Sequence, residues 1–133
     1  MKNRTPWVVA GVAALALGFL LLRPKTGHTV VHPEPRPGVT SDHVLPSGMV
    51  PHASQALEAY EAARRNPQLL DGLYCHCECS KYFGHRSLLT CFESNHGGNC
   101  DICMGEAILA TQLAARGNSL AQIRQAIDAQ FGS

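Results

Sequence analysis

Cysteine and histidine side chains are concentrated in one stretch of the 133-residue chain, residues 75–103. All six cysteines lie there, interleaved with His76, His85 and His96. Thiolate sulfur and imidazole nitrogen are ligands that soft and borderline metal ions prefer, and thiols also form disulfides and transfer electrons. The residue types alone therefore permit metal binding, disulfide bonding and thiol redox chemistry, and the spacing must decide among them.

The first cluster is Cys75-x-Cys77-x-Cys79. In an extended backbone, residues i, i+2 and i+4 point to one face, so we expect three thiolates that share one ion or bridge two. A disulfide between neighbours of this cluster is expected to be strained, because the two Cβ atoms point in the same direction. The spacing of the first cluster therefore favours metal.

The second cluster, Cys100-x-x-Cys103, precedes an apolar run and is expected at the beginning of a helix, where residues i and i+3 share a face. The positive end of the helix dipole stabilises a thiolate, so we predict sulfurs of low pKa that are ready for metal or redox chemistry. Gly97 and Gly98 supply a flexible turn that can bring His96 next to Cys100.

Among three interpretations we favour a soft-metal site, with Cu(I) as the first candidate. Six sulfurs exceed the ligand set of one tetrahedral zinc ion, and thiolate-rich sites select Cu(I) or Zn(II). Zn(II) held by four of these side chains is the second candidate. The expected sulfur ligands are all six cysteines and the expected nitrogen ligands are two histidines: Cys75, Cys77, Cys79, Cys91, Cys100, Cys103, His85 and His96.

Two alternatives stay open. An exported small domain with six cysteines can hold three disulfides, which would make this a disulfide-stapled interaction domain whose pairing the sequence leaves undecided. Thiol oxidoreductase activity at Cys100 and Cys103 is the third interpretation, but no βαβ pattern accompanies the motif. Since the chain also lacks a Ser-His-Asp order, paired catalytic carboxylates and a phosphate loop, we expect a binding protein rather than an enzyme.

Helices are expected to position the two clusters. Apolar residues at i, i+3, i+4 and i+7 predict an amphipathic helix over 52–65. The stretch 101–116 is apolar nearly all round, as a buried central helix would be. Ser119 and Gln122 form a capping-box pattern that begins a last helix. A short helical bridge is expected over 85–92, and no stretch predicts a strand.

Two segments precede the domain, which we place at residues 47–133. Residues 1–22 have a basic beginning and an uncharged apolar run, which predicts a transmembrane signal anchor, with a cleaved secretory signal as the alternative. Residues 23–46 are rich in proline and are expected to form an extended linker that packs against nothing. The expected fold class is mainly α: a small helical domain with an irregular Cys/His-rich loop, behind a transmembrane anchor and a Pro-rich linker.

The order of cysteines and histidines also resembles that of a known family. The matching residues are Tyr74-Cys75-His76-Cys77-Glu78-Cys79, Gly84-His85-Arg86, Cys91-Phe92, His96 and Cys100-Asp101-Ile102-Cys103. The set resembles the bacterial PCYCGC-motif proteins, which are small exported or lipid-anchored proteins of unsettled activity. Tyr74, His76 and Glu78 replace Pro, Tyr and Gly of the motif, and all three cysteines are kept. The resemblance implies an exported small domain and supplies no reaction. With the predicted anchor, the expected location is the bacterial cell membrane, with the domain on the extracytoplasmic side.

Charge and composition bear on the partners. The sequence has 11 Lys+Arg against 10 Asp+Glu and only 6% aromatic residues, without a basic run. Nucleic-acid binding depends on neutralising phosphates with basic side chains, so nucleic acid is not an expected partner. The expected partners are metal ions, the membrane through the N-terminal helix, and a metal-delivery protein.

Overall fold

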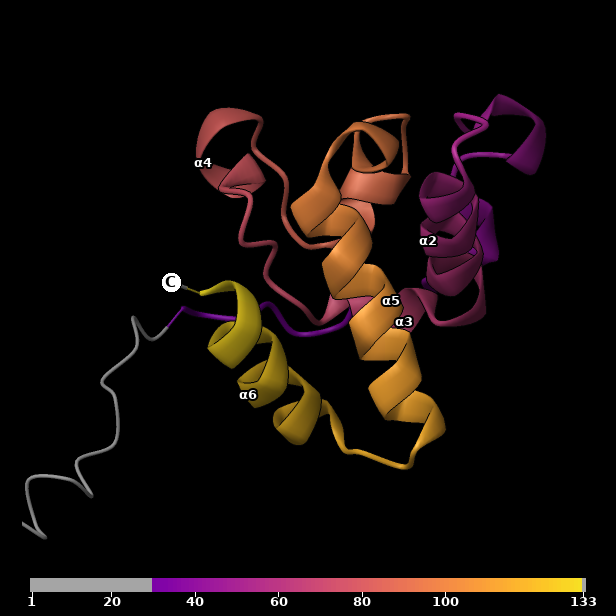
Figure 1. Cartoon of the computed structure of the whole chain (residues 1–133). Helices are drawn as coiled ribbons and strands as arrows, with labels where there is room; N and C mark the ends of the chain where they lie inside the picture. Colours follow the sequence, from indigo (N-terminus) through magenta and orange to yellow (C-terminus); the bar gives the residue numbers. More distant parts are fainter. Residues whose placement is uncertain (1–29, 133) are drawn as a thin grey trace, which may run out of the picture.

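The computed structural model describes residues 30–132 of the chain, and within that range it is mainly helical and contains no strand. Figure 1 shows the helices together with the Cys/His-rich loop between α3 and α5. The predicted mainly α fold of this region is confirmed. The helices are α2 (Ser54–Arg65), α3 (Pro67–Asp71), α4 (Cys79–Tyr82), α5 (Asp101–Ala115) and α6 (Leu120–Phe131), with short 3-10 turns η1 (Ser41–His43), η2 (Ser47–Met49), η3 (Leu89–Phe92) and η4 (Gly97–Asn99).

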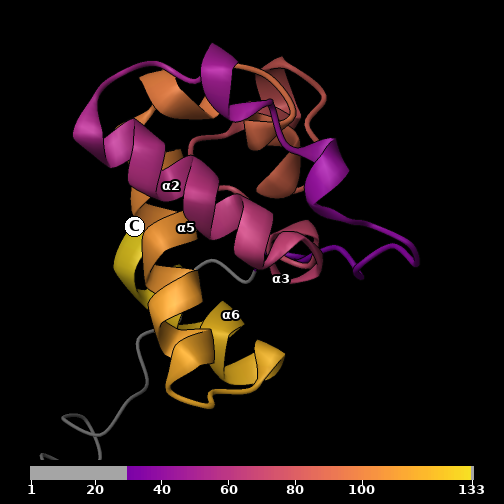
Figure 2. The ribbon, with the colours of Figure 1, turned by 90° about the vertical axis from the view of Figure 1, so that its right-hand side faces the viewer.

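Helix α5 is the central element, as its apolar circumference predicts. It packs against α2 on one side and α6 on another, and it also contacts α3 and η4 (Figures 1 and 2). Its buried residues include Cys103, Met104, Ala107 and Ala110. The buried side chains of α2 are mostly alanines, such as Ala59, and small buried side chains let packed helices approach closely. The second cysteine cluster therefore begins a helix that is fixed by packing on several sides.

Helix α6 begins with the predicted capping box. The Ser119 hydroxyl accepts a hydrogen bond from the Gln122 backbone N–H, and the Gln122 side chain accepts one from the Ser119 backbone N–H. Ile123 and Ile127 are buried against α5 and its neighbours. At Gly105 of α5 an added Cβ would lie 3.1 Å from the Phe131 ring, so a glycine allows the two helices to meet there.

The part of the proline-rich stretch that the structure describes packs onto the helices. Val39 and Val44 are 4% and 5% exposed and belong to the hydrophobic core. Arg36 pairs with the fully buried Asp71 at 2.8 Å, and His32 lies 3.0 Å from Asp128. This segment contributes isolated valines to the core without forming a helix or strand of its own. The side chains of Arg36 and His32 make its polar contacts to the helices. Packed residues therefore occur before residue 47, within the stretch that was expected to pack against nothing.

The boundaries of the other elements differ slightly from expectation. Only Leu89–Phe92 of the expected bridge over 85–92 is helical, as the single turn η3. Pro67 ends α2 as expected but also begins α3, because the missing N–H of proline costs nothing at the first helical position. The predicted anchor over 1–22 lies outside the described residues. Among residues 30–132 there is no helix with the length and apolar character needed to cross a membrane.

Candidate metal centre

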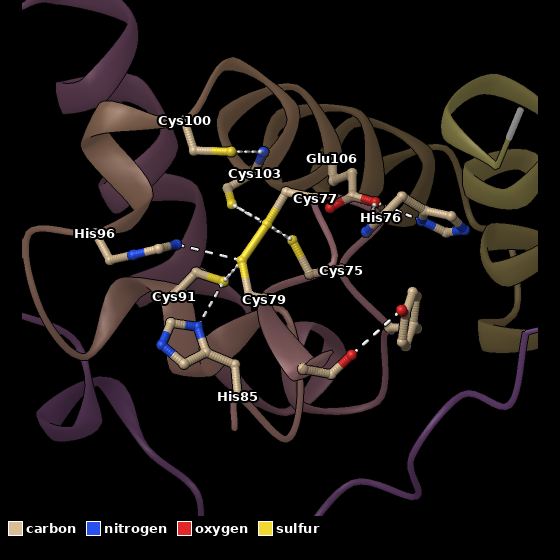
Figure 3. The surroundings of a disulfide bond; sticks show 12 residues. Cys75, His76, Cys77, Cys79, His85, Cys91, His96, Cys100, Cys103 and Glu106 are labelled. Carbon is tan, nitrogen blue, oxygen red and sulfur yellow. Dashed lines mark hydrogen bonds and ion pairs between the residues drawn. A yellow bond between two sulfur atoms is a disulfide. The ribbon is translucent and has the colours of Figure 1, made fainter. Parts of the chain in front are cut away.

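Five of the six cysteines converge in the interior. The sulfur atoms of Cys75, Cys77, Cys79, Cys91 and Cys103 all lie within 4.8 Å of one another (Figure 3). They come from the loop before α4, the first residue of α4, the turn η3 and the first turn of α5. All except Cys77 are buried. Residues separated by up to 28 positions are thus brought to one point, as a shared metal site requires.

Two histidines extend this set on one side. The Nε2 atom of His96 lies 3.2 Å from Cys79 Sγ, and Nδ1 of His85 lies 3.3 Å from Cys91 Sγ. Together these four side chains form a second group whose ligand atoms lie within 4.8 Å of one another. Cys79 and Cys91 therefore belong to both groups, as ligands that bridge two ions would. The Cys/His cluster can hold a metal ion.

The distances between the ligand atoms are slightly shorter than those expected around one tetrahedral metal ion. Two thiolates bound to one tetrahedral ion at about 2.3 Å lie about 3.8 Å apart, and a thiolate and an imidazole about 3.6 Å apart. Apart from Cys77 and Cys79, which are bonded to each other, the neighbouring sulfurs are separated by 3.3 to 3.6 Å. Sulfur and nitrogen are separated by 3.2 and 3.3 Å. Movements of a few tenths of an ångström would accommodate an ion, so no rearrangement of the helices is needed.

Cys100 is the one predicted ligand that the structure leaves apart. It occupies the N-cap of α5, where its sulfur accepts a hydrogen bond from the Cys103 backbone N–H at 3.4 Å. It belongs to neither of the two groups described above. The expected approach of His96 to Cys100 is also not observed, because the imidazole turns toward Cys79 instead. Seven of the eight predicted ligand side chains are therefore brought together.

The structure contains one disulfide, between Cys77 and Cys79. Our expectation of parallel Cβ vectors in an extended segment is wrong at this point. Glu78 has φ 60° and ψ 21°, so the backbone is left-handed between the two cysteines and their Cα atoms lie 5.5 Å apart. The other four cysteines are free. A bond between residues two positions apart closes a very small loop, so it does not staple distant elements as three disulfides would.

The buried free thiols of the cluster have raised pKa values in the metal-free protein. The pKa of Cys75 lies above the usual range of a thiol, first because of its hydrogen bond with Cys103 and then because of burial and the nearby Glu106 carboxylate. The pKa of Cys103 is also raised, although the contact with Cys75 acts in the opposite direction, because Cys91 and burial outweigh it. Our prediction of a low pKa at Cys103 is therefore wrong for the metal-free state. An incoming ion must displace protons from these sulfurs.

A buried pair, Glu106 and His76, fixes the loop that carries the first cysteine cluster. Glu106 is fully buried, and its Oε1 accepts hydrogen bonds from the His76 backbone N–H at 2.9 Å and from the His76 ring Nδ1 at 2.6 Å. The Nε2 atom of His76 lies 3.1 Å from Oδ1 of Asp128, which is close enough for an ion pair, but the geometry is not that of a hydrogen bond. The Glu106 hydrogen bond is the main cause that raises the pKa of His76. His76 thus faces away from the sulfurs and anchors the loop (Figure 3).

Sequence reasoning found one half of this pair. A carboxylate within the apolar face of a helix indicates a buried partner, and Glu106 carries that signal. Its partner is His76, whereas Arg86 pairs with Asp71 at 2.9 Å. Asp71 was missed altogether, although it also accepts hydrogen bonds from Arg36 and Ser87. No sequence pattern marks Asp71, because its partners lie on distant segments.

Comparison with known proteins gives one match. The family model described as "Protein of unknown function with PCYCGC motif" covers residues 25–133, which includes most of the proline-rich stretch. No curated protein and no solved structure matches the chain. The match covers far more than half of the sequence and contains every cysteine. The chain therefore belongs to the PCYCGC family, as the order of its cysteines and histidines predicts.

Proposed function

We propose that this protein binds Cu(I) in a polynuclear thiolate site and serves in copper trafficking, sequestration or delivery. The observation that carries the proposal is the convergence of five cysteine sulfurs and two imidazole nitrogens in two overlapping groups. One tetrahedral ion uses four ligands, so seven ligand atoms suit more than one ion. Cys79 and Cys91, which belong to both groups, are the bridging ligands in this proposal.

The chemistry of the ligands supports a soft ion. Sulfur dominates the set, and thiolate ligands select Cu(I) and Zn(II) over hard cations. The nearest buried carboxylate, Glu106, has its Oε1 occupied by His76 and does not offer a hard-ligand alternative among the sulfurs. Zn(II), held by four of the same side chains, is the second candidate. Burial of the sulfurs also excludes water, which favours low coordination numbers for Cu(I).

The two sides of the site differ in access. Cys75, Cys79, Cys91 and Cys103 are buried, whereas His85 and His96 are partly exposed. Phe83 packs against both imidazoles, with ring centroids 6.0 and 5.0 Å away, and is itself 67% exposed. We propose that ions enter and leave across this histidine edge, where a metal-delivery protein can approach.

The proposed location is the extracytoplasmic side of the bacterial cell membrane. The support is the apolar run within residues 1–22, which suits a membrane anchor at the N-terminus. A tethered domain with an exposed histidine edge is suited to receive or donate ions close to the membrane surface.

The test is a Cu(I) titration of the fully reduced full-length chain under anaerobic conditions, against a competing Cu(I) chelator. We expect more than one ion per chain. Cys91→Ser should lower the number of ions bound, because a hard hydroxyl replaces a bridging sulfur. Cys100→Ser is the matched control and should retain the full number, since Cys100 belongs to neither group. Equal losses in the two variants, or no Cu(I) retained against the chelator, would refute the proposal.

A further inference from the structure

The Cys77–Cys79 disulfide joins two neighbouring ligand sets. Cys77 lies in a triangle of sulfurs with Cys75 and Cys103, whose three separations are 3.3, 3.4 and 3.4 Å. We call these three residues the sulfur triangle. Cys79 lies instead beside His96 and Cys91, at 3.2 and 3.6 Å. With His85, these form a group that we call the mixed site: Cys79, His85, Cys91 and His96.

The disulfide leaves the mixed site incomplete as a ligand set. A sulfur in a disulfide is not a thiolate, and thiolate is the form that binds metal. Cys79 therefore cannot contribute while it is bonded to Cys77. The other three side chains, His85, Cys91 and His96, remain available. If Cys79 were released, two cysteines and two histidines would surround one point, which is a common tetrahedral zinc ligand set.

Two free thiols are placed to release Cys79. Cys75 and Cys103 are both free, and both contact Cys77 Sγ. A thiolate that attacks one sulfur of a disulfide expels the other sulfur as a thiolate. Attack on Cys77 by either neighbour therefore expels Cys79, and the new disulfide remains inside the sulfur triangle. Figure 3 shows the three sulfurs of the triangle and the disulfide in close proximity.

We propose that metal entry drives this exchange, so that the protein moves its disulfide into the sulfur triangle and completes the mixed site. A bond forms between Cys77 and either Cys75 or Cys103, and the Cys77–Cys79 bond breaks. The attacking thiol loses its proton to solvent, and Cys79 leaves as the thiolate that the ion binds. Cys91 loses a second proton when it binds. The number of disulfides does not change, so neither oxidant nor reductant is consumed.

The ion supplies the direction of the exchange. In the metal-free chain the disulfide lies between Cys77 and Cys79. An ion stabilises only the isomers in which Cys79 is a free thiolate, so metal binding shifts the exchange toward them. The separations in the mixed site, 3.2 to 3.6 Å, suit a single tetrahedral ion after small movements. The protein would thus bind one ion without a reductant, as an oxidising compartment demands. This inference rests on the proposed metal-binding function.

The experiment uses Zn²⁺, which has no redox chemistry, as the probe. The full-length chain is purified without reductant, incubated with or without Zn²⁺, quenched in acid, and its free thiols are alkylated under denaturing conditions. The disulfide is then reduced and labelled with a second reagent, and mass spectrometry locates the second label. Without Zn²⁺ the label should lie on Cys77 and Cys79. With Zn²⁺ it should lie on Cys77 and either Cys75 or Cys103, with one ion per chain.

Variants identify the attacking sulfurs. The double variant Cys75→Ser, Cys103→Ser should keep the label on Cys77 and Cys79 and should take up Zn²⁺ only after a reductant is added. The single variants Cys75→Ser and Cys103→Ser should each still exchange, with the second label on Cys77 and the one remaining partner. These single variants test the proposal even if the double variant fails to fold. Cys100→Ser is the matched control, since Cys100 lies outside both sets, and it should behave as the unaltered chain.

The outcomes separate the two proposals. A label that stays on Cys77 and Cys79 at saturating Zn²⁺, or that is absent from Cys79 before Zn²⁺ is added, overturns the exchange. If Zn²⁺ then binds once a reductant is present, the metal site itself stands. If neither Zn²⁺ nor Cu(I) binds the fully reduced chain, the proposed function fails together with the exchange.

Discussion

The buried pair of Glu106 and His76 offers a sharp test of how the first cysteine cluster is positioned. The substitution Glu106→Gln preserves the shape of the side chain and removes its charge. Glu106 is fully buried and the His76 side chain is 5% exposed, so solvent cannot replace the lost interaction. Hydrogen bonds to charged groups contribute about 1.5–3 kcal/mol, and we expect a loss of stability in that range. Glu106→Ala removes the partner entirely and should cost about 3–5 kcal/mol.

The dependence on pH distinguishes the pair from a simple packing effect. The folded pKa of His76 is raised, mainly by its hydrogen bond with Glu106. The stabilisation by the pair is therefore fully present below the ordinary histidine pKa of about 6.5 and is lost as the pH rises through the folded value. The difference between Glu106→Gln and the unaltered chain should be largest near pH 6 and should shrink in alkaline solution.

The assay is urea unfolding of the metal-free chain, followed by helical circular dichroism at several pH values. Glu58→Gln is the matched control, because Glu58 is exposed on α2 and its substitution should change stability by less than about 0.5 kcal/mol. Metal affinity should also fall in Glu106→Gln, because the loop that carries Cys75 and Cys77 loses the charged group to which His76 anchors it. A Glu106→Gln variant as stable as the control, or a deficit that is constant with pH, would refute the reasoning.

Three further predictions concern the rest of the molecule. Asp71→Asn should lower the free energy of unfolding by about 1.5–3 kcal/mol at neutral pH. Burial raises the pKa of Asp71, but hydrogen bonds from Arg36 and Ser87 outweigh it and hold the pKa below its usual value. The stabilisation is therefore lost as the pH falls through that lowered value, and urea midpoints from pH 7 down to pH 2 should show the deficit disappear. Val39→Ala, which removes two buried methyl groups at about 0.8 kcal/mol each, should lower the free energy of unfolding by about 1.6 kcal/mol, whereas an unchanged stability would mean that the segment is a free linker. Metal affinity should increase as the pH rises above neutrality, because the raised pKa values of Cys75 and Cys103 make protons compete with the ion, and competition titrations at a series of pH values measure the slope.

Helices were predictable from the sequence because their determinants are local. The capping box at Ser119 and the apolar circumference of α5 depend on residues a few positions apart, and both are confirmed. Burial within a helix was predicted less well. Leu57 fits the apolar i, i+3, i+4 and i+7 spacing that predicts α2 but is 43% exposed, whereas four alanines of that helix are buried. The choice of face depends on the volume that the neighbouring helix leaves, which periodicity does not contain.

Contacts between distant segments could not be predicted. The proline-rich segment has no periodicity, yet Arg36 and His32 reach carboxylates on α3 and α6. The disulfide depended on the left-handed conformation of Glu78, a residue type without a strong preference for it. The candidate ligands themselves were predictable as residue types, because cysteine clusters are conspicuous. Their division into a sulfur triangle and a mixed site required the fold.

The arrangement of elements explains why the site can be both buried and adjustable. Cys103 is fixed by the central helix α5, whereas Cys75 and Cys77 lie on a loop whose backbone N–H groups at Tyr74 and His76 donate hydrogen bonds to side chains of other segments. Residues on that loop can shift by tenths of an ångström without disturbing the packing of α2 against α5. Glu106, one turn beyond Cys103 on the same helix, tethers that loop by accepting hydrogen bonds from His76. A rigid sulfur on one side and a tethered loop on the other allow a metal ion, or a migrating disulfide, to be accommodated while the helical core stays unchanged.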